Sequence, residues 1–194
     1  MLKIIASLIF LLLSIFIVPL SFARTNSFVS IVNPVRGEDF WDLKDQQPQT
    51  AVFGQIDILN RLNMSATWLL RFDVLGNKKI VDALKGLQDE KGLFLEITPT
   101  WAKEAGVKYY QSENWHTAGS AFLTGYERNE REKLIDSAFS KFNEVFGFYP
   151  TSVGAWWIDS FSLGYMEEKY NISANLTVAD QFSTDDYQVW GLYF

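Results

Sequence analysis

The sequence contains no cysteine and only one histidine, and these two shortages exclude several kinds of site. Without cysteine there can be no disulfide, so a folded domain must be held together by its core. Zinc sites are built largely from imidazole and thiolate ligands, and this chain offers too few of either. We therefore expect no metal and no other cofactor; only a metal bound wholly by carboxylates would escape this argument.

Positive charge is also in short supply. The chain has 17 Lys and Arg residues against 23 Asp and Glu residues, a formal net charge of −6. Nucleic acids and anionic lipid surfaces attract basic proteins, so this balance argues against either one as the main partner. An acidic protein is better suited to a neutral ligand.

The N-terminus carries a long apolar run. Lys3 precedes the apolar residues 4–20, and Ala23 closes a short stretch of the kind that a signal peptidase reads. This order predicts a cleaved secretory signal over residues 1–23 and a single secreted or cell-envelope domain over residues 24–194. An uncleaved anchor stays open, because the run is near the lower length for spanning a bilayer. Either way, contact with a membrane is expected only through this segment.

Apolar patterning in the remaining residues alternates between strand-like and helix-like segments. Five strands separated by helices indicate an α/β fold with a parallel sheet, either a β/α barrel or a doubly wound sheet. The expected strands cover residues 28–32, 66–72, 93–97, 152–158 and 174–178, and the expected helices cover 52–62, 80–87, 127–145 and 160–170.

The third helix has recognisable signals at both ends and follows an unusually long segment. Thr124 and Glu127 have the spacing of a capping box, and Gly147 stands where a helix stop belongs. Roughly 29 residues (98–126) precede this helix, which is long for a loop, so they are either functional or contain elements that the pattern does not reveal. Because a barrel needs more than five strands, we expect the barrel to be incomplete at its C-terminus.

The stretch FGFYPTSVG over residues 146–154, with the strand and helix after it, resembles the polysaccharide deacetylase (NodB-type) barrel. The Lys91-Gly92 turn into the third strand resembles the same family. The similarity extends loosely from Phe28 to the end of the chain, in the order and spacing of elements more than in identities. It implies a parallel β/α barrel of the glycoside hydrolase/deacetylase type.

The chemical motifs of that family are missing. Where the family has paired aspartates after the first strand, this chain has NPVRG at residues 33–37. Where it has two metal-binding histidines, the chain reads LEITPT at residues 95–100, and GAWW at residues 154–157 replaces its Arg-x-Pro motif. The resemblance therefore implies a divergent member, and we exclude a zinc-dependent deacetylase of the usual kind.

Carboxylates do follow the expected strands, where the working residues of parallel barrels lie. Glycoside hydrolysis needs a pair of them, one as acid and one as nucleophile or base. We predict Glu96 and Asp159 as this pair, with Asp180 next, and Glu38 and Asp39 as solvated surface.

Each candidate has a structural alternative. Asp159 precedes a helix and suits an N-cap, and Asp180 suits a turn. Glu96 is flanked by apolar residues in a strand that should be buried, where a carboxylate is costly unless it is paired. Arg36 or Arg71 could supply that structural partner.

Aromatic side chains are abundant near the same positions. Trp101, Trp115 and His116 belong to the long segment before the third helix, and Trp156 and Trp157 lie on the fourth strand. We predict these five residues as substrate-binding, with the tryptophans, Tyr109 and Tyr110 forming apolar faces that stack on sugar rings. A lone histidine in a loop is usually neither a ligand nor a base, which is the alternative for His116. The alternative is that the rings cap the barrel as an apolar cluster. Because successive strand residues face opposite ways, only one of Trp156 and Trp157 can point into the barrel.

Two functions follow from these expectations. The first is a metal-independent glycoside hydrolase acting on a polysaccharide or cell-envelope glycan, with Glu96 and Asp159 as catalytic residues. The second is a non-catalytic carbohydrate-binding module derived from a polysaccharide deacetylase barrel. Any enzymatic activity is expected to be that of a hydrolase.

Overall fold

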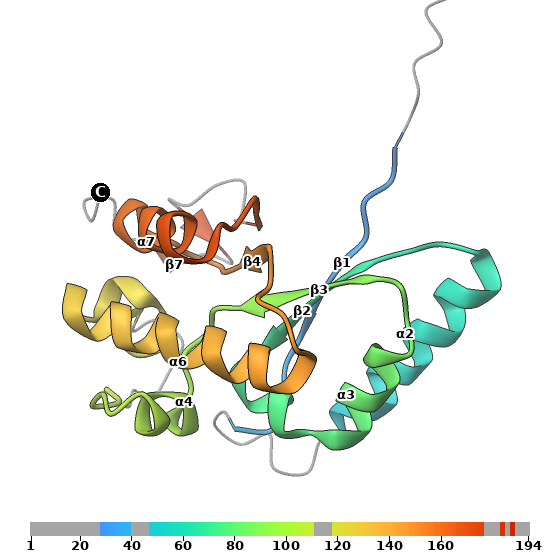
Figure 1. Cartoon of the computed structure of the whole chain (residues 1–194), viewed down its shortest axis with the longest axis horizontal. Coiled ribbons are helices and arrows are strands. Elements are labelled where there is room, and N and C mark those ends of the chain that lie inside the picture. The colour runs from blue at the N-terminus through green and yellow to red at the C-terminus, as the bar shows by residue number, and fades with distance from the viewer. Residues whose placement is uncertain (1–27, 40–46, 111–117, 177–182, 185–186, 189–194) are drawn as a thin grey trace, which may run out of the picture.

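A computed structural model of the chain describes residues 28–39, 47–110, 118–176, 183–184 and 187–188 (Figure 1). Five parallel strands form one sheet in the order β1-β2-β3-β4-β5, and a short antiparallel hairpin lies apart from it. The strands are β1 Val32–Val35, β2 Thr67–Arg71, β3 Glu90–Phe94, β4 Ser152–Gly154 and β5 Ala174–Leu176, and the hairpin pairs β6 Ser183–Thr184 with β7 Tyr187–Gln188.

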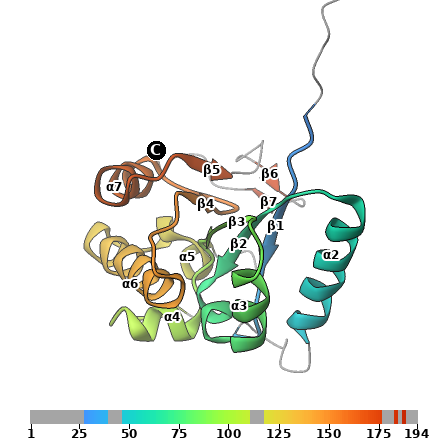
Figure 2. The ribbon, with the colours of Figure 1, turned by 45° about the vertical axis from the view of Figure 1, so that its right-hand side comes forward.

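The connections between the strands are helical. They comprise α2 Pro48–Leu62, the 3₁₀ turn η1 Phe72–Gly76, α3 Lys78–Lys85, α4 Pro99–Glu104, α5 Ala118–Ala121, the 3₁₀ turn η2 Leu123–Gly125, α6 Arg128–Phe146 and α7 Ser160–Tyr170. The sheet is curled into a half-barrel with helices flanking it (Figure 2). The predicted α/β class and parallel sheet are confirmed. The five described strands form an open half-barrel rather than a closed one.

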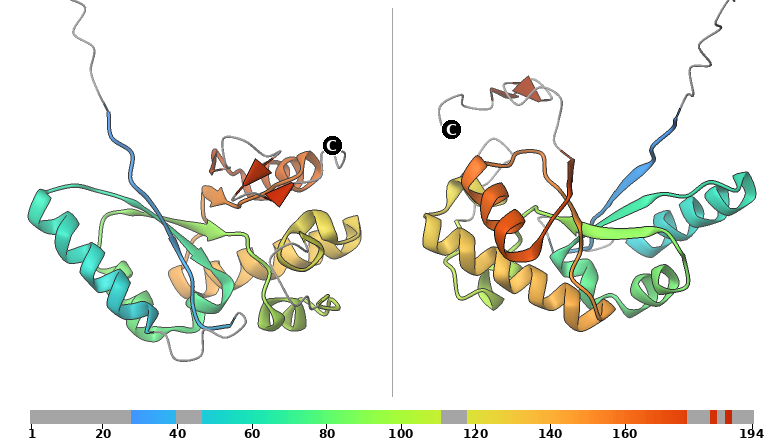
Figure 3. Two further views of the ribbon diagram at one scale, coloured as in Figure 1. Left: turned by 180° about the vertical axis from the view of Figure 1, so that it is seen from behind. Right: turned by 45° about the horizontal axis from the view of Figure 1, so that its top comes forward.

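The two faces of the sheet differ in character because side chains alternate along each strand. On β2, Trp68 and Leu70 are fully buried in the core that packs against the helices. Leu69 and Arg71 point to the opposite, inner face of the half-barrel. Figure 3 shows α7 lying along α6 on the outside of the sheet. Arg71 is fully buried on this inner face, so its hydrogen-bond partners must come from residues that also line this face.

Some element boundaries differ from the sequence expectations. β3 begins at Glu90 rather than Leu93, because Glu90 pairs with Thr67 in the ladder and accepts a hydrogen bond from its hydroxyl (3.2 Å). Helix α6 begins at Arg128, and its capping partner is Glu130, whose carboxylate accepts the Glu127 N–H at 3.1 Å. The expected pairing of Thr124 with Glu127 is wrong, since Thr124 belongs to η2.

The long segment before α6 is not a plain loop. Its described part contains α4, α5 and η2, short elements with too few turns to show a helical apolar period. Within the described part of the chain, no helix has the length and apolar character needed to cross a bilayer. The predicted signal over residues 1–23 lies outside the described residues.

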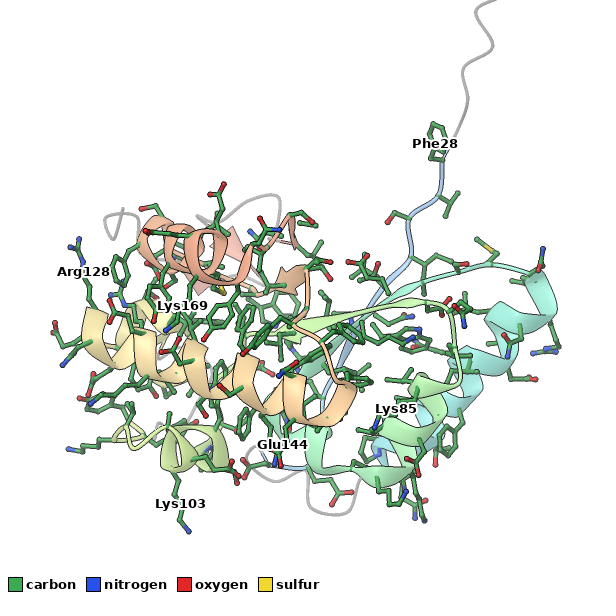
Figure 4. The ribbon with its side chains drawn as sticks, viewed as in Figure 1. Phe28, Lys85, Lys103, Arg128, Glu144 and Lys169 are labelled. Atoms are coloured by element: carbon green, nitrogen blue, oxygen red, sulfur yellow. The ribbon has the colours of Figure 1, made fainter. Side chains whose placement is uncertain are left out.

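Helix α7 packs on α6 through apolar contacts, such as the Tyr170 ring stacked on Phe139 at a centroid distance of 4.1 Å, and through polar contacts to Asp136. The carboxylate of Asp136 on α6 accepts from the Tyr170 hydroxyl (2.7 Å), the Tyr165 hydroxyl (3.0 Å) and the Lys169 ammonium (2.8 Å). Figure 4 shows Lys169 between the two helices. Burial alone would raise the pKa of Asp136, but these three partners hold it below its usual range.

Candidate functional site

Charged side chains gather where β1, β2 and β3 end. Arg36 follows β1, Arg71 is the last residue of β2 and Glu96 lies just beyond β3. Because the strands are parallel and adjacent, their carboxyl ends meet at one edge of the sheet. In parallel α/β folds this edge is the usual place for a functional site.

Glu96 is 1% exposed and is held by two arginines. Arg36 donates from Nε to Oε2 at 2.7 Å and from Nη2 to Oε1 at 3.2 Å, a bidentate arrangement. Arg71 donates from Nη1 to Oε2 at 3.0 Å. Glu96 is thus paired with both of the arginines that the sequence suggested as its structural partners. Both oxygens of the carboxylate are engaged within the protein.

Arg71 is completely buried and connects Glu96 to a second carboxylate. Its Nε and Nη2 donate to the two oxygens of Asp73 at 2.8 and 2.9 Å, and Nη2 also donates to the Gly37 carbonyl at 3.1 Å. Burial alone would raise the pKa of Asp73, but the hydrogen bonds and charge of Arg71 outweigh it and lower that pKa.

Asp39, expected as solvated surface, is half-exposed but also hydrogen-bonded to the network. Its backbone N–H donates to Asp73 Oδ2 at 3.0 Å, and its own Oδ2 accepts the Thr100 N–H at 2.9 Å. The segment after β1 is therefore tied to both η1 and α4. The first turn of α4 also supplies a favourable dipole for the Asp39 carboxylate.

Aromatic rings border the exposed side of this network. The Arg36 side chain is 32% exposed, and its guanidinium carbon lies 5.2 Å from the Phe94 ring centroid and 5.6 Å from that of Trp156. β4 ends at Gly154, so Trp156 and Trp157 lie after the strand and the predicted strand alternation does not apply to them. Trp156 is partly exposed, whereas Trp157 is buried at 5% exposure, which corrects its predicted place on a sugar-stacking surface. Tyr109 is half-buried, and burial raises the pKa of its hydroxyl. We call Arg36, Asp39, Arg71, Asp73, Glu96, Tyr109 and Trp156 the carboxyl-edge site.

Asp159 is the N-cap of α7, which is the structural role that its position before the helix suggested. Its Oδ1 accepts the Ser162 N–H at 2.8 Å and Arg131 Nη1 at 3.0 Å, and its Oδ2 accepts the Ser162 hydroxyl at 2.7 Å. The residue is 4% exposed. The hydrogen bonds of Asp159 and those of Glu96 involve different residues, so these bonds do not join the two carboxylates into one pair.

The capping role of Asp159 leads to a prediction. Asp159→Ala should lower the free energy of unfolding by about 2 kcal/mol, because it removes the cap and leaves Arg131 without this partner. Asp159→Asn should cost less, since its amide oxygen can still accept the Ser162 N–H. Chemical denaturation measures both changes, and hydrogen exchange should show α7 losing protection first. Equal losses for the two variants would contradict the capping role.

Trp101 occupies the core rather than an open surface. It lies on α4, is 0% exposed and stacks on Phe72 with a centroid distance of 5.7 Å. Its indole N–H donates to the Leu134 carbonyl at 2.9 Å. The predicted stacking of Trp101 on sugar is therefore corrected, because neither ring face is accessible. Trp115, His116 and Asp180 lie outside the described residues.

The residues of the site do not fit a divalent metal. Among the residues that the structure describes, no group of three or more His, Cys, Asp or Glu side chains could hold one. At the carboxyl edge, moreover, the guanidinium groups of Arg36 and Arg71 already neutralise Glu96 and Asp73. A cation brought here would meet two fixed positive charges, so the site is unsuited to a divalent metal.

Asp73 is the member of the site that sequence reasoning missed. Its signal was the Arg71-x-Asp73 spacing at the end of a strand that reads as buried. An arginine in such a position needs more than one carboxylate to occupy its five donors, and the nearest acid in sequence is the first to test.

Comparisons with known proteins give one likeness of fold. No family model matches the sequence, and no curated protein matches it. A crystal structure of a protein from Mycobacterium smegmatis, assigned as a polysaccharide deacetylase, superposes with a TM-score of 0.52 at 14% sequence identity. The match covers 84% of this chain and 65% of that chain, so this chain spans less than two thirds of its length. The likeness supports a distant relationship in fold.

Proposed function

We propose that this chain is an extracytoplasmic carbohydrate-binding protein that uses a deacetylase-like half-barrel without hydrolysing its ligand. The observation that carries the proposal is the state of Glu96, buried at the functional edge of the sheet and bonded to two arginines. A residue arranged in this way stabilises the edge of the sheet. The predicted secretory signal supplies the location, and a polysaccharide or cell-envelope glycan is the expected partner.

Two observations favour a carbohydrate as the ligand. The fold is similar to that of a protein assigned as a polysaccharide deacetylase, whose name points to polysaccharide. In addition, the accessible part of the carboxyl-edge site combines Trp156 and Tyr109 with the polar groups of Arg36 and Asp39. Aromatic faces beside a few fixed polar groups are what a concave sugar site requires.

The two carboxylates that could have hydrolysed a glycosidic bond are committed elsewhere. A glycosidase needs one carboxylic acid to protonate the leaving oxygen and a second carboxylate on the other side of the bond. Glu96 is bonded to Arg36 and Arg71, and Asp159 caps α7. Neither of these two carboxylates is therefore free to act as the acid or the base of a glycosidase.

Trp156→Ala tests the binding site. In a glycan-array screen followed by titration calorimetry on the full chain, this variant should lose about tenfold or more in affinity, because burial of one large ring contributes over 1 kcal/mol. The matched control is Phe53→Ala on α2, which removes a ring that is 41% exposed and is not part of the carboxyl-edge site. Equal affinities for the two variants would place the ligand elsewhere.

Product analysis tests the absence of turnover. The glycan that binds is incubated with the protein, and released sugars and acetate are measured by chromatography and mass spectrometry. We expect no product. Release of reducing ends by the parent that disappears in a Glu96→Gln protein shown to be folded by circular dichroism would instead establish a glycosidase with Glu96 as a catalytic residue.

A further inference from the structure

Building on the proposed function, we infer that Arg36 is a positioning residue of the carboxyl-edge site: its guanidinium, fixed by Glu96, holds the Trp156 ring in the orientation that meets the ligand. Two independent observations support this inference. The first is that the Arg36 side chain links the carboxyl ends of strands that are not neighbours. The second is that no hydrogen bond to a described residue orients the Trp156 ring.

Arg36 connects strands that lie apart in the sheet. It follows β1, while Phe94 is the last residue of β3 and Trp156 comes two residues after the end of β4. Its guanidinium carbon lies 5.2 Å from the centroid of the Phe94 ring and 5.6 Å from that of the Trp156 ring, both within reach of a cation–π contact. In the order β1-β2-β3-β4-β5, two strands separate β1 from β4. Arg36 therefore ties the segment after β4 to the first strand of the half-barrel.

The guanidinium of Arg36 is itself held in place by buried groups. Its Nε and Nη2 donate to the two oxygens of Glu96 at 2.7 and 3.2 Å, and this fork fixes the plane of the guanidinium as well as its position. Glu96 is 1% exposed and also accepts a hydrogen bond from Arg71, which is completely buried. The surface that Arg36 offers to Trp156 is therefore fixed by buried residues.

The Trp156 ring depends on such support more than Trp68 or Trp101 does. The Trp68 N–H donates to a carboxylate at 2.8 Å and the Trp101 N–H donates to a backbone carbonyl at 2.9 Å, so a hydrogen bond orients each of these rings. Trp156 Nε1 is closed off from solvent and has no hydrogen-bond partner among the described residues. Packing therefore orients this ring, and the cation–π contact with Arg36 is a directional part of that packing.

The exposed part of the Trp156 side chain consists of carbon, because the one polar atom of the ring is closed off from solvent. A ligand meets such a surface by stacking, and the strength of a stacking contact depends on the angle at which the ring is presented. The orientation that Arg36 sets therefore contributes to affinity through Trp156.

The alternative is a purely structural role for Arg36 as a counter-ion of Glu96. Arg71 already supplies Glu96 with a buried cation at 3.0 Å, whereas the Arg36 side chain is 32% exposed. Pairing with Glu96 alone also leaves the two rings beside Arg36 without a role. The two roles predict different results when Arg36 is replaced: a structural role changes stability alone, and a positioning role also changes the surroundings of Trp156.

Fluorine NMR of the full chain labelled with 5-fluorotryptophan reports on Trp156 without any ligand. The chain has seven tryptophans, and the Trp156 line is the one that Trp156→Phe removes. In Arg36→Met we expect this line to broaden and to move by more than its own width. Arg36→Lys keeps the charge but not the planar fork, so its line should lie between the two. The matched control is Arg61→Met on α2, an exposed arginine outside the site, which should leave the line in place.

A double-mutant cycle measures how much of the contribution of Arg36 to affinity passes through Trp156. Cellohexaose, mannohexaose and chitohexaose are titrated against the full chain by calorimetry, and the tightest binder is used. Arg36→Met should weaken its binding about fivefold in the parent, and by no more than about twofold in the Trp156→Ala background, where the ring that Arg36 holds is gone.

The outcomes separate this inference from the function beneath it. An unchanged Trp156 line in a folded Arg36→Met protein overturns the inference. A loss of the same size in both backgrounds also overturns it, because Arg36 would then act on the sugar directly. If Arg36→Met does not fold, Arg36→Lys supplies both measurements. If none of the three sugars binds and the glycan array is also blank, the proposed function fails, while the fluorine line still decides whether Arg36 positions Trp156.

Discussion

Glu96→Gln is expected to lower the free energy of unfolding by about 3–5 kcal/mol, the usual cost of breaking a buried ion pair. Arg71 is 0% exposed and would keep its charge while losing one of its two carboxylate partners. Arg36 would lose its bidentate acceptor. The new amide would also turn an N–H₂ group toward a guanidinium, placing a donor against a donor.

Urea unfolding followed by tryptophan fluorescence and circular dichroism measures this loss. The matched control is Glu104→Gln on α4, the same chemical change at an exposed position, which should stay within about 0.5 kcal/mol of the parent. If Glu96→Gln is too unstable to purify, Arg36→Met gives a milder form of the test, because Arg71 continues to hold Glu96.

The opposite result would change the functional conclusion. Catalytic residues are often held at a cost in stability, so a Glu96→Gln protein that is as stable as the parent, or more stable, would indicate a carboxylate kept for chemistry. Such a result, together with sugar release by the parent protein, would favour the glycosidase over the binding module.

The order of strands and helices could be predicted from the sequence because it depends on local period. Leu134, Ala138 and Phe142 recur at helical spacing and all lie buried on α6. The pairing of Glu96 could also be predicted in part, since a carboxylate between Leu95 and Ile97 in a buried strand is costly unless a cation pairs with it. Arg36 and Arg71 could be suggested, because each follows or ends a strand that reaches the same edge of a parallel sheet.

Contacts between loops could not be predicted in the same way. Asp39 reads as a solvated residue, yet it accepts the Thr100 N–H across 61 positions of sequence. This contact depends on where α4 packs, and α4 has only six residues, too few to show an apolar period. The sequence also could not decide between an N-cap and a catalytic role for Asp159, because an Asp-Ser pair before a helix is compatible with both. The structure decides by showing that Asp159 accepts hydrogen bonds from Ser162 and Arg131.

Trp101→Ala is expected to lower the free energy of unfolding by about 3–5 kcal/mol, as for other large-to-small changes in a core. The indole is 0% exposed and stacks on Phe72 with an interplanar angle of 5°. Its removal would leave a cavity between α4 and η1 and would remove the hydrogen bond that the indole N–H donates to the Leu134 carbonyl. The loss should appear as a lower denaturation midpoint.

The comparison of Trp101→Ala with Trp156→Ala separates the two interpretations of the aromatic residues. If Trp101 is a core residue and Trp156 contacts the ligand, Trp101→Ala should lose stability, while the molecules that stay folded should bind glycan with the parent affinity. Trp156→Ala, whose ring is partly exposed beside Arg36, should lose affinity with a much smaller loss of stability. A Trp101→Ala protein that is fully stable but no longer binds would restore the sugar-stacking role predicted from the sequence, and would mean that α4 moves away from η1 when the ligand binds.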